Sequence, residues 1–473
     1  MELHIRLEND RDLARQVYQQ VRAAILEGRL RQGDRIPATR ELARSLQISR
    51  NTVALAYEWL AAEGLVSGRH GAGTLVDVAP VARPRPRNGA ALRIRAVWKT
   101  APPAVTAEAP RFDFGVGVPD ASQFPYDVWR RTLARQWRGS STEGLYGDPS
   151  GHPALRSAIA RHVAMARGVR ARPEDILVTS GAQGAFDLVA RVLLEPGARV
   201  AVEDPGYPRP RLLFASYGAR IVPVPVDDEG LDIAALPDNV SLIYVTPSHQ
   251  FPLGMPMSHA RRMALLAWAE RRNAVVIEDD YDSEFRFGGR PLETLQAIDR
   301  FGRVVYVGSF SKSLLPALRI GFLVAPPSLT RALGAASQVA GSEPPWAAQA
   351  TLASLIDHGH FARHVRKMRR LYAARHERIL RTLESDFSRF LEPAPSVTGV
   401  HLAARLRSKD VRDEREILAR ARRTEVRFDR LSAYCVGRPQ PGLVLGYGAI
   451  RDGDIAEGLR RLRTCCAAVL RAT

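Results

Sequence analysis

The chain has little lysine and little cysteine, and it has no long apolar run. Its 473 residues include 68 Lys plus Arg, yet only four of these are lysines. The three cysteines, Cys435, Cys465 and Cys466, are odd in number and show neither a disulfide framework nor a metal-ligand spacing, so we expect no bound metal. No stretch approaches the ~20 apolar residues of a membrane span, and the N-terminal MELHIRLEND lacks the order of a signal peptide. These absences predict a cytoplasmic protein with no membrane partner.

The composition is that of a globular protein with a strong positive charge. The 45% hydrophobic and 25% charged residues exclude a fully disordered chain, and the length suits two to four domains. The net charge of +18 suits a polyanionic partner such as double-stranded DNA, because neutralised phosphates release counterions. An arginine-rich composition without such a partner stays open on charge alone.

A change in composition divides the chain into three parts. Residues 80–110 are rich in Pro, Ala and Arg and lack periodicity, which is typical of a basic linker. We therefore expect a small N-terminal domain over residues 1–79, this linker, and a large domain over residues 111–473.

The N-terminal part has the pattern of a winged helix-turn-helix of the α+β class. Apolar spacing predicts helices over 13–27, 39–46 and 50–63, with Ser49 as the N-cap of the third. The residues SGRHGAGTLV predict a β-hairpin wing with Arg69 and His70 at its tip. The helix that follows a short turn enters the major groove in such domains. A three-helix bundle whose arginines are merely solvated is the alternative.

The motifs PATRELA, SRNTV and RHGAGT make this prediction more specific. Over Leu13–Val76 the chain resembles the winged helix of the GntR superfamily. This resemblance implies DNA contacts by Arg40, Arg50, Asn51, Thr52, His70 and Gly71, and the wing tip adds Arg69.

Beyond the linker, short apolar runs alternate with amphipathic stretches. DILVTS, RVAVED, SLIYVTP, AVVIEDD and RVVYVGSF read as strands, which predicts an α/β domain with a mainly parallel sheet covered on both faces. Polar clusters follow these strands, and ligands bind at the carboxyl ends of such sheets. From about His360 the pattern favours a smaller C-terminal subdomain.

Lys312 follows one of these strands, in SFSK. An amine can lose its proton and attack a carbonyl, which a guanidinium does not do. The aldehyde of pyridoxal 5'-phosphate (PLP) would suit this amine as a Schiff-base partner. PLP also needs phosphate donors, a carboxylate at its ring nitrogen and a flat stacking partner.

Each of these needs has a candidate residue. The phosphate donors are Ser309, Ser311, Arg319 and the backbone of Ala182 and Gln183. Asp279 is the expected partner of the ring nitrogen, Tyr281 of the phenolic oxygen, and Tyr207 the stacking ring. Taken singly, each residue also has an ordinary structural explanation.

Together, from about Phe112 onward, these motifs resemble fold-type I PLP-dependent aminotransferases, with YGDPSGHPALRSAIA and PGYPRPR as further matches. With the winged helix and the linker, the whole chain resembles the MocR family of transcriptional regulators. The resemblance implies a head-to-tail homodimer, PLP held by Lys312, and repeated DNA half-sites.

Two departures from aminotransferases favour sensing an amine, an amino acid or PLP over turnover. Phe251 stands where these enzymes have an asparagine, and LVLGYGAI lacks their carboxylate-binding arginine; Arg209 or Arg430 could replace it as an effector contact. A working aminotransferase with a DNA-binding module is the alternative, so residual transaminase activity stays open. A GntR repressor that has lost PLP is disfavoured, because Lys312 and Asp279 are present.

Overall fold

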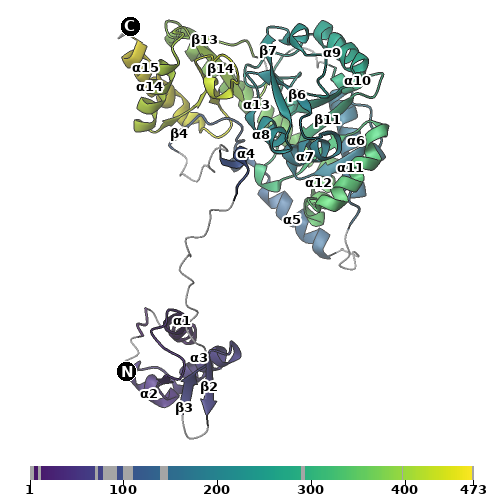
Figure 1. The fold of residues 1–473 in the computed structure, drawn as a ribbon. Coiled ribbons are helices and arrows are strands. Elements are labelled where there is room, and N and C mark those ends of the chain that lie inside the picture. Colours follow the sequence, from purple (N-terminus) through teal and green to yellow (C-terminus); the bar gives the residue numbers. More distant parts are fainter. Residues whose placement is uncertain are drawn as a thin grey trace. The chain divides into compact units, whose positions relative to one another are not determined.

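A computed structural model describes residues 5–8, 12–69, 73–77, 93–99, 110–138, 147–288, 293–396 and 398–470. The chain divides into two compact units, Met1–Arg93 and Ile94–Thr473 (Figure 1). Among these described residues, no helix combines the length and the apolar character that crossing a membrane requires.

The N-terminal unit contains the expected helices and hairpin. Its elements are α1 (Leu13–Leu26), β1 (Arg35–Ile36), α2 (Thr39–Ser45), α3 (Arg50–Ala62), β2 (Val66–Arg69) and β3 (Gly73–Val76). The strands form an antiparallel sheet in the order β1-β3-β2. Val21 of α1 and Val53 of α3 are buried in a core of this unit's own. The winged helix-turn-helix prediction is confirmed.

The Ile94–Thr473 unit is built on an eight-stranded sheet with the order β5-β12-β11-β10-β9-β6-β7-β8. Its strands are β5 (Ile176–Thr179), β6 (Arg199–Asp204), β7 (Arg220–Asp227), β8 (Gly230–Leu231), β9 (Leu242–Val245), β10 (Val275–Asp280), β11 (Val304–Ser309) and β12 (Gly321–Val324). From β7 to β11 all neighbours are parallel, whereas β12 runs antiparallel to β11 and β5. The central strands are apolar along their length because helices bury both faces of the sheet.

Helices pack on the sheet in separate apolar clusters. They are α5 (Tyr126–Arg138), α6 (Pro153–Arg167), α7 (Gly181–Leu193), α8 (Pro208–Ser216), α9 (His259–Arg271), α10 (Leu295–Ile298), α11 (Pro327–Ala340) and α12 (Trp346–Asp357). The helices fall into three groups according to the apolar cluster that they share. One cluster contains residues of α7, α8 and α11, another residues of α9 and α10, and a third residues of α5, α6 and α12.

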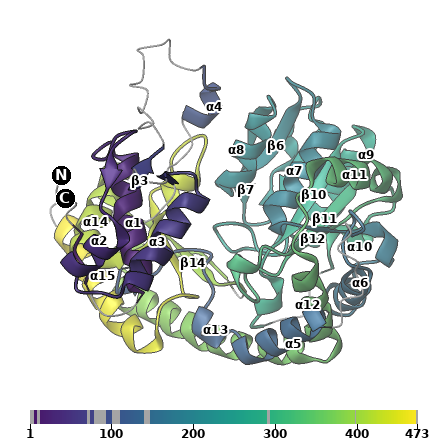
Figure 2. The same ribbon diagram turned by 90° about the horizontal axis from the view of Figure 1, so that it is seen from below.

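The smaller C-terminal subdomain begins at α13 (His360–Asp386), as the sequence predicts. Figure 2 shows this helix running from the α5 and α12 side toward α14 and α15. The subdomain also holds α14 (Val411–Arg423), α15 (Ile455–Leu470) and a sheet of β13 (Leu391–Pro393), β14 (His401–Leu406), β17 (Gly442–Gly446) and β16 (Asp429–Arg430). An earlier segment joins it, because β4 (Phe112–Asp113) pairs with β15 (Val426–Arg427).

The expected linker over 80–110 lies largely outside the described residues. Its described part includes a short helix, α4 (Ala96–Lys99), which contacts α8. The Arg95 guanidinium donates a hydrogen bond to the Ser216 carbonyl. This end of the expected linker therefore packs on the Ile94–Thr473 unit.

Candidate functional site: a PLP-type lysine site and a helix-turn-helix

Lys312 lies in the turn after β11, at the carboxyl edge of the sheet. Its Nζ donates a hydrogen bond to the Gly117 carbonyl at 2.5 Å. Burial lowers the pKa of Lys312, while the nearby Asp282 and Asp279 act in the opposite direction. Gly117 has φ 83°, and a Cβ there would lie 2.8 Å from Nζ, so the close approach requires glycine. The site thus holds an amine that is easier to deprotonate than an exposed lysine.

Asp279 lies on the neighbouring strand β10, opposite Val307 of β11. Its Oδ2 accepts a hydrogen bond from Tyr244 Oη at 2.5 Å, and burial raises the Asp279 pKa to about 7. Its Oδ1 is buried and has no partner among the described residues. An unpaired carboxylate oxygen at this depth fits a cationic N–H group, such as the protonated ring nitrogen of PLP.

The first turn of α7 offers backbone donors next to Arg319. Ser180 precedes the helix, but its side chain does not cap it and donates instead to the Ser342 carbonyl at 2.6 Å. Arg319 Nη2 donates to the Ser180 carbonyl at 2.9 Å, which holds its guanidinium at this turn. A Cβ on Gly321 would lie 2.7 Å from the Gly181 carbonyl carbon, so β12 passes directly beside the turn. Uncapped N–H groups with an arginine suit a phosphate.

The remaining predicted phosphate donors lie on the same two segments. Ala182 and Gln183 belong to the first turn of α7, and the Gln183 Nε2 is buried without a partner among the described residues. Ser309 ends β11, and its Oγ accepts a hydrogen bond from the Ser311 backbone N at 3.2 Å. Their contact with a phosphate stays a prediction.

The expected stacking residue, Tyr207, lies at the start of α8 within an aromatic cluster. Phe251 is buried, and its ring centroid lies 5.4 Å from that of Tyr207, 6.0 Å from Tyr281 and 4.9 Å from Tyr434. An apolar ring therefore occupies the position where aminotransferases have a hydrogen-bonding asparagine.

Sequence reasoning missed a buried chain of polar groups beside Lys312. Tyr281 Oη lies 2.9 Å from His249 Nδ1, and the same nitrogen lies 2.9 Å from Asp282 Oδ2. The ring of His401 lies beside His249, with centroids 4.9 Å apart. The signal was available, because His249 and Asp282 both stand in the polar clusters that follow strands. These groups fix the orientation of the Tyr281 hydroxyl.

The two predicted effector arginines differ in their surroundings. Arg209 is exposed in the first turn of α8. Its positive charge lowers the pKa of Lys312, although burial, Asp282 and Asp279 have larger effects on that pKa. Arg430 lies on β16, where its Nη1 is 4.0 Å from Oε2 of the buried Glu414. Arg209 is thus close enough to Lys312 for its charge to act on the amine, whereas Arg430 lies near Glu414 of α14. Both effector contacts stay predictions.

The helix-turn-helix presents a polar end at the start of α3. Arg40, Arg50 and Asn51 are exposed, and the backbone N of Thr52 donates to the Ser49 Oγ at 3.0 Å, which confirms the N-cap. The hydroxyl of Thr52 also lies 2.7 Å from Ser49 Oγ. His70, Gly71 and the side chain of Arg69 lie outside the described residues.

Comparisons with known proteins match both units. Residues 110–431 match the family aminotransferase class I and II, and residues 13–76 match the bacterial regulatory proteins of the gntR family. The probable rhizopine catabolism regulatory protein MocR of Rhizobium meliloti is 39% identical over 98% of this chain and 96% of that protein. The chain belongs to the MocR family of transcriptional regulators.

Two further proteins are similar to this MocR-family chain. The transcriptional regulator TauR of Rhodobacter capsulatus is 36% identical over 84% of this chain and 88% of that protein. The kynurenine aminotransferase of Pyrococcus horikoshii, solved in a complex with PMP, is 26% identical with a TM-score of 0.72, over 79% of this chain and 97% of that chain. The MocR-family chain therefore combines a DNA-binding unit with an aminotransferase fold of type I.

Proposed function

We propose that this protein is a transcriptional regulator that binds double-stranded DNA through α3 and its wing, and senses an amine, an amino acid or PLP at Lys312. One observation carries the proposal. A chain with a helix-turn-helix also brings together a half-buried amine, a buried carboxylate oxygen without a partner in the described part of the chain, and an uncapped helix start beside an arginine. These three features match the aldehyde, the ring nitrogen and the phosphate of PLP.

PLP supplies an aldehyde carbon with which amines condense. In this chain Lys312 would hold that carbon, Asp279 the ring nitrogen, and the α7 turn with Arg319 the phosphate. Burial already weakens the hold of Lys312 on its proton, which keeps the amine available as a nucleophile.

The hydrogen bond from Lys312 also connects the sheet to the C-terminal subdomain. Gly117 lies on a segment whose Phe114 carbonyl accepts from the Gly446 N of β17 at 2.8 Å, and whose Val116 N donates to Asp429 Oδ2 of β16 at 3.3 Å. A free ammonium has three N–H donors, whereas an Nζ that has condensed with a carbonyl keeps at most one, so condensation would compete with the hydrogen bond to Gly117. A ligand that engages or frees Lys312 thereby acts on a contact between the two parts of this unit.

Sensing is favoured over turnover by two features of the site. Phe251 brings no hydrogen-bond donor to the place where aminotransferases have an asparagine, and the lost donor weakens cofactor tuning by ~1–3 kcal/mol. The strand β17 carries no arginine to position a substrate carboxylate, and positioning can be worth ~7–11 kcal/mol of a reaction barrier.

The first test is borohydride reduction of the PLP-loaded protein, followed by peptide mass spectrometry. We expect a reduced PLP adduct on Lys312 and a visible absorption band that disappears on reduction. Lys312→Ala should remove both signals. Lys367→Ala, on the exposed side of α13, is the matched control and should keep them. An adduct that persists in Lys312→Ala would contradict the assignment.

The sensing step needs a second readout, because a PLP adduct alone is also compatible with an aminotransferase. Amines that change the absorption band should also change operator affinity, measured by fluorescence anisotropy. Conversion of those amines to carbonyl products at enzymatic rates, with unchanged operator affinity, would favour the aminotransferase alternative. The head-to-tail homodimer implied by the family is part of the proposal, and light scattering tests the dimer.

A further inference from the structure

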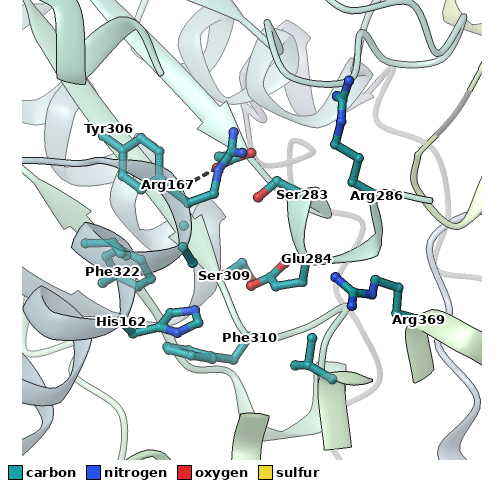
Figure 3. Close-up of a pocket in the computed structure, with 15 residues that line it drawn as sticks. His162, Arg167, Ser283, Glu284, Arg286, Tyr306, Ser309, Phe310, Phe322 and Arg369 are labelled. Atoms are coloured by element: carbon teal, nitrogen blue, oxygen red, sulfur yellow. Dashed lines mark hydrogen bonds and ion pairs between the residues drawn. The ribbon is translucent and has the colours of Figure 1, made fainter. Parts of the chain in front are cut away.

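A cavity of about 250 Å³ lies beside β10 and β11; its lining includes neither Lys312 nor Asp279, but it shares Ser309, a predicted phosphate donor, with the Lys312 site. Asp280 and Tyr306 line it, and Tyr306 Oη donates to Asp280 Oδ2 at 2.6 Å. Successive strand residues point to opposite faces, so Asp280 faces away from the side on which Asp279 meets the Lys312 site. Helices α6 and α13 supply further walls (Figure 3). The space exceeds the ~150 Å³ of an engineered cavity that holds benzene.

The cavity combines an apolar wall with charged groups. Val163, Phe310, Phe322 and Val365 supply the wall. Arg167 is already paired, because its Nε lies 2.7 Å from Asp280 Oδ2 and its Nη2 donates to Ser248 Oγ at 2.6 Å. The other oxygen of this carboxylate, Asp280 Oδ1, is buried and lacks a partner among the described residues. A buried acceptor without a partner favours a bound molecule that can donate a hydrogen bond to it.

The cavity carries positive charge in addition to the ion pair of Arg167 with Asp280. Arg286 and Arg369 also line the cavity, and neither forms an ion pair with another described residue. Figure 3 shows the Glu284 carboxyl between His162 and Arg369. Burial raises the pKa of Glu284 to about 8, so near neutral pH this group is mostly a hydrogen-bond donor and does not cancel the arginines. One anionic group fits this end of the cavity.

We propose that this cavity is a second small-molecule site, which takes a small hydroxy acid with its carboxylate at Arg369 and its hydroxyl toward Asp280. The apolar body of the ligand lies against the phenylalanine wall. Bound there, the ligand joins α13 of the C-terminal subdomain to the strand that carries Asp279. Such a site would let an organic acid act on the same regulator independently of Lys312.

The test titrates 4-hydroxybenzoate into the full-length protein by calorimetry, with benzoate and 4-hydroxybenzamide as comparators. Benzoate lacks the hydroxyl, and the amide lacks the charge. We expect saturable binding of 4-hydroxybenzoate, at least tenfold weaker binding of the amide, and weaker binding of benzoate. Arg369→Gln should weaken 4-hydroxybenzoate at least tenfold, whereas Arg370→Gln, which alters the next exposed arginine of α13, should leave it unchanged.

The binding should persist in Lys312→Ala, which separates this cavity from the PLP-type site. Absence of saturable binding up to millimolar 4-hydroxybenzoate would overturn the proposal. Equal affinity for the acid and the amide, or equal affinity of Arg369→Gln and Arg370→Gln, would overturn it as well. Loss of binding in Lys312→Ala alone would assign the ligand to the Lys312 site instead.

Discussion

At the scale of single residues, the Lys312 site contains ionisable groups whose pKa values are shifted by burial. Asp279 shows this most clearly, because burial raises its pKa from the ordinary 3.8 to about 7. Between pH 3.8 and about 7, the folded protein without cofactor therefore keeps a proton on Asp279 that the unfolded chain has already lost. The stability that this proton gives is fully present below pH 3.8, and it is lost as the pH rises to about 7.

Asp279→Asn should therefore have opposite effects on stability and on cofactor binding. Without PLP, the variant should unfold at a higher temperature than the wild type at pH 8, because a buried charge has been removed, and the difference should vanish near pH 4. Its PLP affinity should fall about 10- to 100-fold, since a charge-assisted hydrogen bond of ~1.5–3 kcal/mol is lost. Calorimetric unfolding and PLP titration measure the two effects.

Asp228→Asn is the control, because Asp228 is exposed. It should change neither quantity. Glu203 and Glu278 are also buried with pKa values of about 7, so Asp279→Asn flattens only part of the pH profile. Unchanged PLP affinity in Asp279→Asn would remove Asp279 from the ring-nitrogen role.

At the scale of elements, the segment from Phe114 to Val118 links the sheet to the C-terminal subdomain. A Cβ on Gly446 would lie 2.1 Å from the Gly115 carbonyl oxygen, and one on Gly448 would lie 2.0 Å from the Val118 carbonyl oxygen. The backbone of this segment therefore packs directly on β17 and the residues after it. Lys312 Nζ donates to the Gly117 carbonyl of the same segment.

Gly117→Ala should test this link. The new methyl group would meet Nζ of Lys312, and the positive φ of 83° is unfavourable for alanine. We expect a loss of stability of ~1–2 kcal/mol and a clear loss of PLP affinity. Gly197→Ala is the matched control, with φ 93° and no atom within 4 Å of the added Cβ. It carries the backbone strain alone, so a similar loss of PLP affinity there would contradict the role of Gly117.

The sequence predicts elements where the pattern is local. Apolar runs bounded by polar clusters predicted β5, β6, β9, β10 and β11, and the helical spacing predicted α1 to α3. It did not predict that β12 runs antiparallel, or that Phe112 pairs with Val426. The pairings of β12 with β5 and of Phe112 with Val426 join residues far apart in the chain and are decided by packing. The contacts of His249 with Asp282 and His401 also join separate segments, whereas Lys312 and Asp279 could be predicted because each follows or ends an apolar strand.

At the scale of the whole molecule, the net charge of +18 does not by itself identify a DNA surface. Arginines are spread over both units, and many pair locally, as Arg375 does with Asp120 and Asp452. Only charges that meet phosphates release counterions and so give a salt-dependent affinity. The salt dependence of the DNA affinity therefore distinguishes arginines that contact phosphates from arginines that pair within the protein.

Arg50→Gln should weaken operator binding, because Arg50 is exposed at the start of α3. If its guanidinium meets a phosphate, the slope of log affinity against log salt should fall by about 1, equally for specific and non-specific DNA. If it contacts a base edge, affinity should fall by ~1–3 kcal/mol for the operator alone. Anisotropy titrations at several salt concentrations distinguish the two. Arg29→Gln, a matched exposed arginine paired with Glu27 outside the helix-turn-helix, should change neither. Equal behaviour of the two variants would mean that α3 does not contact DNA through Arg50.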